Sequence, residues 1–336
     1  MTIAPRRQPG EWEPHDACWI AWPSHAELWQ DELEPARRAF VAMARGIAEG
    51  ERLEVLVPNP DRETEARAAL EGLDARFHRI AFGDIWLRDT APIFVQVDGR
   101  IEGARFRFNG WGGKYLFEED PHVGEAIAAA AGLEAFETPI VLEGGALDGD
   151  GEGTVLTTRQ CLLAPNRNPG LDQAAYERHL ATALGYQRTI WLGDGLQNDH
   201  TDGHVDTIAR FVAPGVVACM EPAGTGDPNA AAMRAIIADL EGATDARGRR
   251  IQVLRVPSPG AVLDTTCNLM PASYLNFYIG NASVVVPVYG AANDDAATRA
   301  IEAMFPGRRT IPIDARAVLS GGGAFHCITQ QQPSPQ

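Results

Sequence analysis

The sequence predicts an α/β fold in which five similar units surround a central axis, and internal repeats are the main evidence. The segment WLRDTAPIFV (residues 86–95) aligns with GHVDTIARFV (203–212), because both contain Asp-Thr, then three variable residues, then Phe-Val. A second pair consists of VLEGGA, starting at residue 141, and VLSGGG, starting at residue 318. The pairs are separated by 117 and 177 residues, close to two and three copies of a unit of about 59 residues. Five such units nearly fill the 336-residue chain.

Each unit is expected to combine strands with helices. Apolar runs rich in β-branched residues predict strands at 52–58, 154–158, 215–220 and 282–288. Alanine, leucine and charged residues at helical spacing predict helices at 31–49 and 229–241, with Asn229 as the N-cap of the second. Repeated units of this kind favour a closed radial array, the five-bladed α/β propeller, in which equivalent residues meet at the axis. Asp89 and Asp206 are equivalent in the first repeat, so we expect them to lie close together.

No linker or low-complexity block divides the chain, so we expect residues 1–331 to form a single catalytic domain and residues 332–336 to form a disordered tail. A hydrophobic content of 45% and a charged content of 22% are typical of a globular protein with a full core. No segment approaches the roughly 18 to 20 apolar residues of a membrane span, and no apolar run follows the N-terminal arginines. We therefore expect a cytoplasmic protein.

The net charge of −16 disfavours binding to nucleic acid and to anionic membranes, and it weakly favours a small cationic partner. Assembly with further copies of the chain, as a homo-oligomer, is left open. The five cysteines are scattered, odd in number and without C-x-x-C spacing, which argues against disulfides and structural zinc.

One cysteine stands out as a candidate nucleophile. Cys327 follows three glycines in SGGGAFHCITQ, where the backbone can pass close to a ligand. The adjacent His326 is a poor base for this thiol if the segment is a strand, because neighbours on a strand point to opposite faces. Cys18, Cys219 and Cys267 lie in or beside apolar runs and fit inert core residues, whereas the sequence leaves Cys161 undecided.

The strongest local signal is the pair His204 and Asp206 in DGHVDTIARF. On a strand, residues two apart face the same way, so both side chains could act on one substrate. The alternative is a metal site formed by His200, Asp202, His204 and Asp206. Gly203 and the strand-like sequence after it disfavour a metal-binding helix, so we expect neither a metal nor any other cofactor.

Three further residues are expected to reach the same centre. Trp86 and Asp89 in DIWLRDTAP offer an aromatic wall and a carboxylate to a flat cation. Glu143 precedes the glycine pair that corresponds to the Cys327 loop in another unit, so it should approach the same axis.

Seven segments, in this order along the chain, together make the sequence resemble the agmatine deiminase family. They are DIWLRDTAP (84–92), FNGWGGKY (108–115), LEGG (142–145), GEGTVLTTRQCLLAPNRNP (151–169), GHVD (203–206), SYLNFYIGN (273–281) and GGGAFHCITQQ (321–331). The resemblance implies the pentein fold, a five-bladed α/β propeller, and hydrolysis of agmatine to N-carbamoylputrescine and ammonia through a covalent cysteine intermediate.

The same resemblance implies a role for each site residue. Cys327 corresponds to the nucleophile, His204 to the acid and base, and Asp89 and Asp206 to the ligands of the guanidinium group. The positions that line the substrate site are Trp86, Glu143, Asn276 and Gly323. Alternative functions are a deiminase of another guanidine or of peptidyl arginine, an amidinotransferase, and a catalytically inactive binding module.

The sequence departs from the family pattern at four positions. His200 stands where an acidic residue is expected, and Asp148 stands where a histidine or similar residue is expected after LEGG. These two changes bear on recognition of the far end of the substrate. Ala91 and Ala324 replace a usual glycine and a usual asparagine, and neither belongs to the catalytic set.

Overall fold

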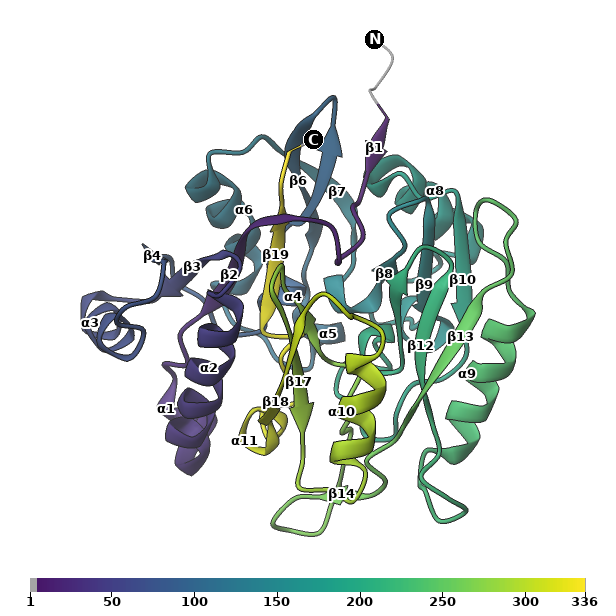
Figure 1. The fold of residues 1–336 in the computed structure, drawn as a ribbon. Coiled ribbons are helices and arrows are strands. Elements are labelled where there is room, and N and C mark those ends of the chain that lie inside the picture. Colours follow the sequence, from purple (N-terminus) through teal and green to yellow (C-terminus); the bar gives the residue numbers. More distant parts are fainter. Residues whose placement is uncertain (1–4, 336) are drawn as a thin grey trace.

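The computed structural model describes residues 5–335, in which five sheets of three or four strands accompany one two-stranded hairpin (Figure 1). The first two sheets have the orders β1 (Arg6–Arg7), β5 (Ile93–Val97), β6 (Arg100–Arg107), β7 (Ala135–Val141), and β10 (Arg188–Leu192), β9 (Thr154–Thr158), β8 (Asp148–Gly149). The next two are β11 (Ala209–Ala213), β12 (Val216–Glu221), β13 (Gln252–Pro257), and β16 (Tyr278–Ile279), β17 (Ser283–Val288), β18 (Arg309–Asp314). The fifth joins β19 (Thr329–Pro333), β2 (His15–Ala21), β3 (Arg52–Val57) and β4 (Ala75–Arg79), and the hairpin is β14 (Val262–Leu263) with β15 (Leu269–Met270).

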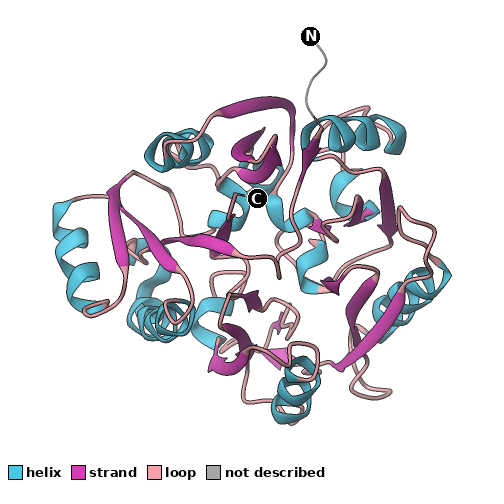
Figure 2. Cartoon of the chain, turned by 45° about the horizontal axis from the view of Figure 1, so that its top comes forward, coloured by secondary structure: helices cyan, strands magenta, loops and turns pink. Residues whose placement is uncertain are grey.

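The five larger sheets share one pairing pattern. In each, an antiparallel pair of strands is extended by a parallel pair, as in β11–β12–β13 and β16–β17–β18. Parallel neighbours need a long crossover, and a helix supplies it in every case. These helices are α2 (Leu33–Ile47), α6 (Asp120–Ala131), α8 (Gln173–Leu184), α9 (Ala230–Gly242) and α10 (Asp294–Glu302), and α3 (Pro60–Ala69) joins β3 to β4. Figure 2 shows the helices at the periphery and the strands closer to the centre.

Amphipathic spacing explains how the longest helix packs. The buried residues of α2 recur three and four positions apart, with Ala36, Ala39, Phe40, Met43 and Ile47 on one face. This face covers β17 and β18, and the same logic predicted the helix at 31–49, whose first residues form the 3₁₀ helix η1 (Gln30–Glu32).

Asn229 occupies the predicted N-cap position of α9 but does not cap the helix with its side chain. The side-chain oxygen instead accepts a hydrogen bond from the backbone nitrogen of Gln197, at 2.8 Å. A long-range contact thus replaces the expected local one.

Seven short helices lie in the connections between the strands. They are α1 (Ala26–Trp29), α4 (Leu87–Thr90), α5 (Gly110–Gly113), η2 (Gly144–Ala146), α7 (Arg159–Leu162), η3 (Val205–Thr207) and α11 (Arg316–Leu319). Contacts between α4 and η2 and between η2 and η3 bring segments far apart in the sequence together. No helix within residues 5–335 combines the length and the apolar character that crossing a bilayer requires.

The prediction that residues 332–336 form a disordered tail is wrong for Gln332 and Pro333. The tail expected to be disordered from residue 332 begins inside β19, where Gln332 pairs with Ala17 and Pro333 with His15 of β2. The reason is a specific contact: the indole nitrogen of buried Trp19 donates a hydrogen bond to the side-chain oxygen of Gln332, at 2.9 Å. The ordered domain therefore extends past residue 331, and the sheet β19-β2-β3-β4 contains strands from both ends of the chain.

Removing residues 332–336 is expected to lower the free energy of unfolding by about 1 to 3 kcal/mol, since the buried Trp19 indole would lose its acceptor. Urea titration followed by tryptophan fluorescence measures the change. Deleting only the last two residues keeps all of β19 and serves as the control. Equal stability of the full-length chain and the longer truncation would contradict this account of the tail.

Candidate active site

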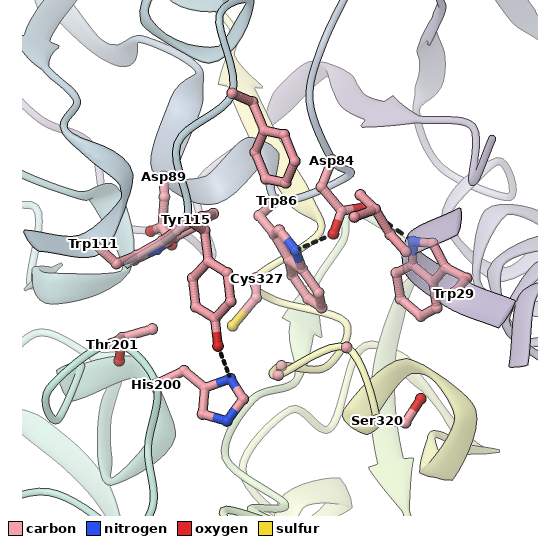
Figure 3. A pocket seen from close by; sticks show the side chains of 15 residues that line it. Trp29, Asp84, Trp86, Asp89, Trp111, Tyr115, His200, Thr201, Ser320 and Cys327 are labelled. Atoms are coloured by element: carbon pink, nitrogen blue, oxygen red, sulfur yellow. Dashed lines mark hydrogen bonds between the residues drawn. The ribbon is translucent and has the colours of Figure 1, made fainter. Parts of the chain in front are cut away.

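A cavity of about 230 Å³ opens beside Cys327, between the loops that connect the sheets (Figure 3). Four of the eight predicted site residues line it, namely Trp86, Asp89, Gly323 and Cys327. The other lining residues are Leu28, Trp29, Asp84, Trp111, Tyr115, Phe117, His200, Thr201, Ser320, Gly321 and Gly322. The remaining predicted residues, Glu143, His204, Asp206 and Asn276, are buried next to these.

Asn276 fixes the position of the Cys327 thiol. Its side-chain nitrogen lies 3.1 Å from Cys327 Sγ, and its oxygen accepts hydrogen bonds from the backbone nitrogens of Ala324 and Cys327, each at 3.2 Å. The glycine before Ala324 leaves no room for a side chain, because a Cβ on Gly323 would lie 2.8 Å from the Trp86 ring and 3.0 Å from Cys327 Sγ. The amide and the bare backbone together keep the sulfur open to the cavity.

The two carboxylates that the repeat predicted to lie together, Asp89 and Asp206, converge next to this thiol with the imidazole of His204. An added Cβ on Gly145 would lie 2.6 Å from His204 Nδ1, 3.0 Å from Asp89 Oδ1 and 3.1 Å from Asp206 Oδ2. The Cys327 thiol also lies 3.5 Å from Asp206 Oδ2. Asp89 is held by the backbone nitrogen of Gly145 and the indole of Trp111, both of which donate to it at 2.9 Å.

The local structure that produces this convergence differs from the predicted strand. His204 precedes the 3₁₀ helix η3, which contains Asp206, so the two side chains meet because the chain turns and not because strand residues alternate. The segment around His326 also turns, since the backbone nitrogen of Thr329 donates to the carbonyl of His326. His326 Nδ1 therefore reaches Asp206 Oδ2, at 2.7 Å, the same oxygen that the thiol approaches.

A buried network of charged residues contacts Asp206 through His326. His326 Nε2 lies 2.9 Å from Glu11 Oε1, and Glu11 also accepts hydrogen bonds from Arg88 and Arg210. Although burial opposes ionisation, Arg210, His326 and Arg88 lower the pKa of Glu11 well below its usual value. Burial likewise opposes the charge of Asp206, but the bond from His326 lowers the pKa of that carboxyl group. Both carboxyl groups are thus held as anions.

For the Cys327 thiol, by contrast, the surroundings disfavour the charged form. Burial, together with the carboxylates of Asp206 and Asp89, raises the pKa of the Cys327 thiol well above its usual value. Burial and the neighbouring Asp206 also raise the pKa of Asp89, against the influence of His204. The site therefore carries an excess of negative potential that a bound cation would neutralise.

His204 is buried, and neither of its ring nitrogens has a hydrogen-bond partner among the described residues. Its closest charged neighbours are Asp89, 3.8 Å from Nδ1, and Glu143, 3.9 Å from Nε2. Burial disfavours the imidazolium, but Asp89, Cys161 and Glu143 raise the pKa of His204 well above its usual value. Glu143 is itself fixed by Arg167, whose Nε donates to it at 2.9 Å. Such an imidazole is placed to give and to accept protons.

Aromatic side chains form the outer wall of the cavity. The rings of Trp29 and Trp86 stack with their centroids 6.0 Å apart, and both indole nitrogens donate to Asp84, at 3.0 and 2.8 Å. Across the cavity, the Tyr115 hydroxyl lies 3.2 Å from His200 Nδ1 (Figure 3). These flat faces suit a planar cation.

Three of the four residues of the alternative metal site bind other partners. His200 contacts Tyr115, Asp202 binds Lys114 and Arg167, and Asp206 binds His326. Within residues 5–335, the donor group that could hold a metal consists instead of Glu143, Cys161 and His204.

Two of the departures from the family pattern lie in different environments. His200 lines the cavity, whereas Asp148 does not and instead accepts hydrogen bonds from Arg210 Nε and the backbone nitrogen of Phe211, at 2.5 and 2.6 Å. Asp148 therefore belongs to the buried ionic network of Arg210. Of these two departures from the family pattern, only His200 lines the cavity.

Sequence reasoning missed several residues that build the site. Trp111 lies in FNGWGGKY, whose glycines allow the left-handed backbone there, and this segment could have identified it. Glu11, Arg167 and Arg210 carry no comparable spacing signal, and only the fold brings them to the centre.

Alkylation of Cys327 by iodoacetamide should be slow at neutral pH and should rise about tenfold per pH unit, without a plateau up to about pH 8.5, the usual pKa of a free thiol. The raised pKa leaves little thiolate in the free protein. Asp206→Asn should accelerate the reaction at fixed pH, because one of the causes of the raised pKa is removed. Mass spectrometry of the Cys327 peptide gives the rates, and a fast, pH-independent reaction of the unmodified chain would contradict this reading.

Comparison with known proteins agrees with this site. Residues 7–333 match the family model of Porphyromonas-type peptidyl-arginine deiminase. The agmatine deiminase of Stutzerimonas stutzeri is 38% identical over 363 residues, covering 100% of this chain and 98% of that protein.

Solved structures show the same relationship. The agmatine deiminase of Enterococcus faecalis superposes with a TM-score of 0.93 at 33% identity, over 99% of both chains. An amidinotransferase of Microseira wollei, 13% identical with a TM-score of 0.54 over 98% of both chains, shares the fold, which is the α/β pentein fold. The resemblance found in the sequence is confirmed, and the chain belongs to the family of agmatine deiminases and Porphyromonas-type peptidyl-arginine deiminases.

Proposed function

We propose that this protein is an agmatine deiminase, which hydrolyses the guanidinium group of agmatine to N-carbamoylputrescine and ammonia. The observation that carries the proposal is the position of the Cys327 thiol on a cavity wall, with the carboxylates of Asp89 and Asp206 and the unpartnered imidazole of His204 beside it. A guanidinium carbon is made stable by resonance and positive charge, so its attack needs a strong nucleophile and fixed counter-charges. This site supplies both.

Substrate binding prepares the nucleophile. Asp206 Oδ1 has no hydrogen-bond partner among the described residues, and together with Asp89 it offers acceptors to the guanidinium N–H groups. The positive charge of the substrate offsets the two carboxylates that raise the pKa of Cys327, so the thiolate forms in the complex and the thiol proton leaves to water. Trp86 provides a flat wall for the cation.

The reaction then takes place in two steps. The thiolate forms a C–S bond with the guanidinium carbon, and the imidazolium of His204 donates a proton as the C–N bond breaks and ammonia leaves. The covalent thiouronium remains on Cys327. Neutral His204 next removes a proton from water, and the hydroxide attacks the same carbon. The C–S bond then breaks and restores the thiolate, while the remaining hydroxyl proton leaves to water as the C=O bond of the ureido product forms. His204 ends as imidazolium, ready for the next cycle.

The cavity lining favours agmatine over free arginine. Among the described lining residues there is no arginine or lysine that would pair with a substrate carboxylate. The alternatives are a deiminase of another guanidine or of peptidyl arginine, an amidinotransferase, and an inactive binding module. Measuring ammonia release from agmatine, arginine, arginine peptides and other guanidines discriminates among them. Higher kcat/KM for any substrate other than agmatine would replace the proposed function.

We also propose that the five larger sheets are the blades of a five-bladed propeller. The support is the shared pairing pattern, an antiparallel pair extended by a parallel pair, which occurs in each of the five sheets. The chain from residue 5 to residue 333 then forms one catalytic domain. A cytoplasmic location and assembly as a homo-oligomer stay predictions.

Cys327→Ser should abolish turnover of agmatine, because a serine hydroxyl lacks the thiolate character that the attack requires. In acid-quenched wild-type enzyme, mass spectrometry should find a substrate-dependent adduct on the Cys327 peptide and on none of the other four cysteine peptides. Normal turnover by the serine variant would exclude the covalent mechanism.

Asp89→Asn and Asp206→Asn should each reduce kcat/KM by well over tenfold, since a buried charge-assisted hydrogen bond contributes roughly 1.5 to 3 kcal/mol. Because both carboxylates bind one cation, the double variant should lose less than the sum of the two losses in free energy. Asp245→Asn, which removes a buried carboxylate bound to Arg249, is the control. Additive losses, or near-normal activity of either single variant, would contradict a shared cation site.

A further inference from the structure

Cys161 is a buried thiol that the proposed reaction does not use, although it lies against the catalytic imidazole. Its sulfur, a ring nitrogen of His204 and a carboxylate oxygen of Glu143 all lie within 4.8 Å of one another. All three residues are buried. One sulfur, one nitrogen and one oxygen thus point at a common centre behind the substrate cavity.

The chain fixes this arrangement through Thr158. The Thr158 hydroxyl accepts a hydrogen bond from the backbone nitrogen of Cys161, at 3.2 Å, and thereby caps α7. The same hydroxyl donates to the carbonyl of Gly203, at 2.6 Å, and so ties α7 to the segment that carries His204. Because one side chain anchors both segments, the thiol and the imidazole hold their relative positions.

Two of the three candidate metal ligands have an atom without a hydrogen-bond partner among the described residues. Glu143 binds Arg167 through Oε1, whereas Oε2 has no hydrogen-bond partner among the described residues, and neither does His204 Nε2. These two atoms lie 3.9 Å apart. Tetrahedral zinc with bonds of about 2.0 to 2.1 Å places two such ligands roughly 3.3 Å apart, so a shift of about half an ångström would bring both to a metal.

We propose that Glu143, Cys161 and His204 form a binding site for a thiophilic divalent cation, with Zn²⁺ as the best match to a sulfur, nitrogen and oxygen donor set. On binding, the Cys161 thiol proton and any imidazolium proton of His204 leave to water, and the metal gains bonds to the thiolate, the imidazole and the carboxylate. The two negative ligands balance the charge of the cation. Asp202 pairs with the nearby Arg167.

Metal binding at this site inhibits the enzyme. This consequence rests on the proposed function, because the nitrogen that binds the metal belongs to the imidazole that transfers protons to ammonia and from water. The metal and the reaction therefore exclude each other, and chelator-treated enzyme keeps its full activity. Cys327 is not a ligand here, since its sulfur already contacts Asn276 and Asp206.

Cobalt provides a readout that does not depend on activity. Chelator-treated enzyme titrated with Co²⁺ should develop thiolate-to-cobalt charge-transfer absorption in the near ultraviolet, and Zn²⁺ should displace the signal. The absorption should persist in Cys327→Ser and disappear in Cys161→Ser, with Cys161→Ala as a second variant if the serine does not fold. Cys219→Ser, another buried cysteine, should behave as wild type.

The same variants connect binding to activity. Zn²⁺ should inhibit wild-type ammonia release, and Cys161→Ser should require at least about tenfold more Zn²⁺ for the same inhibition. Absorption that is retained in Cys161→Ser but lost in Cys327→Ser would assign the metal to the nucleophile and overturn the proposal. Absence of a cobalt signal in the wild type would overturn it as well. Absence of agmatine turnover alongside a normal cobalt signal would instead reject only the proposed function.

Discussion

The hydrogen bond between His326 and Asp206 is the interaction on which the rest of the site depends. It holds a buried carboxylate as an anion 3.5 Å from the thiol, and a buried charge of this kind needs a fixed partner. Glu11 continues the chain of contacts to Arg88 and Arg210, so the charges below the site are compensated within the protein. On the cavity side, Asp206 Oδ1 has no hydrogen-bond partner among the described residues, so the negative potential there is left for the substrate to neutralise.

In the proposed mechanism, this asymmetry explains how a thiol with a raised pKa serves as the nucleophile. In the free enzyme, burial and two carboxylates raise the pKa of the Cys327 thiol and so favour its protonated, less nucleophilic form. A guanidinium group brings the missing positive charge to the same carboxylates and lowers the cost of the thiolate. Reactivity then depends on the presence of a cation of the correct shape, which protects the thiol from other electrophiles.

The sequence predicted which of the proposed catalytic residues lie together better than it predicted the local structure around them. The repeat placed Asp89 and Asp206 at one centre, and both lie around Gly145. Strand alternation, however, gave the wrong reason for pairing His204 with Asp206, since both belong to a turn that includes η3.

The same assumption left the role of His326 unrecognised. Turns in this fold carry the functional side chains, and their geometry follows from tertiary contacts. Glu11 meets Arg210 across 199 positions of sequence, a distance over which no local pattern can predict a contact. The residues that the repeat relates could therefore be predicted to lie together. The charged residues that support them, such as Glu11 and Arg210, could not.

The proposed catalysis and the proposed inhibition by a metal depend on the same feature of His204. This feature is an imidazole whose ring nitrogens have no hydrogen-bond partner among the described residues. A residue that must give a proton to one group and take it from another cannot have its ring nitrogens occupied by permanent hydrogen bonds. Among residues 5–335, the fold leaves both nitrogens without a hydrogen-bond partner and buries them beside Glu143 and Cys161. Free donor atoms held at short separations are also what a thiophilic metal requires. The geometry that suits His204 to its proposed role in proton transfer thus also suits it to the proposed metal, and the identity of residue 161 should determine how tightly that metal binds.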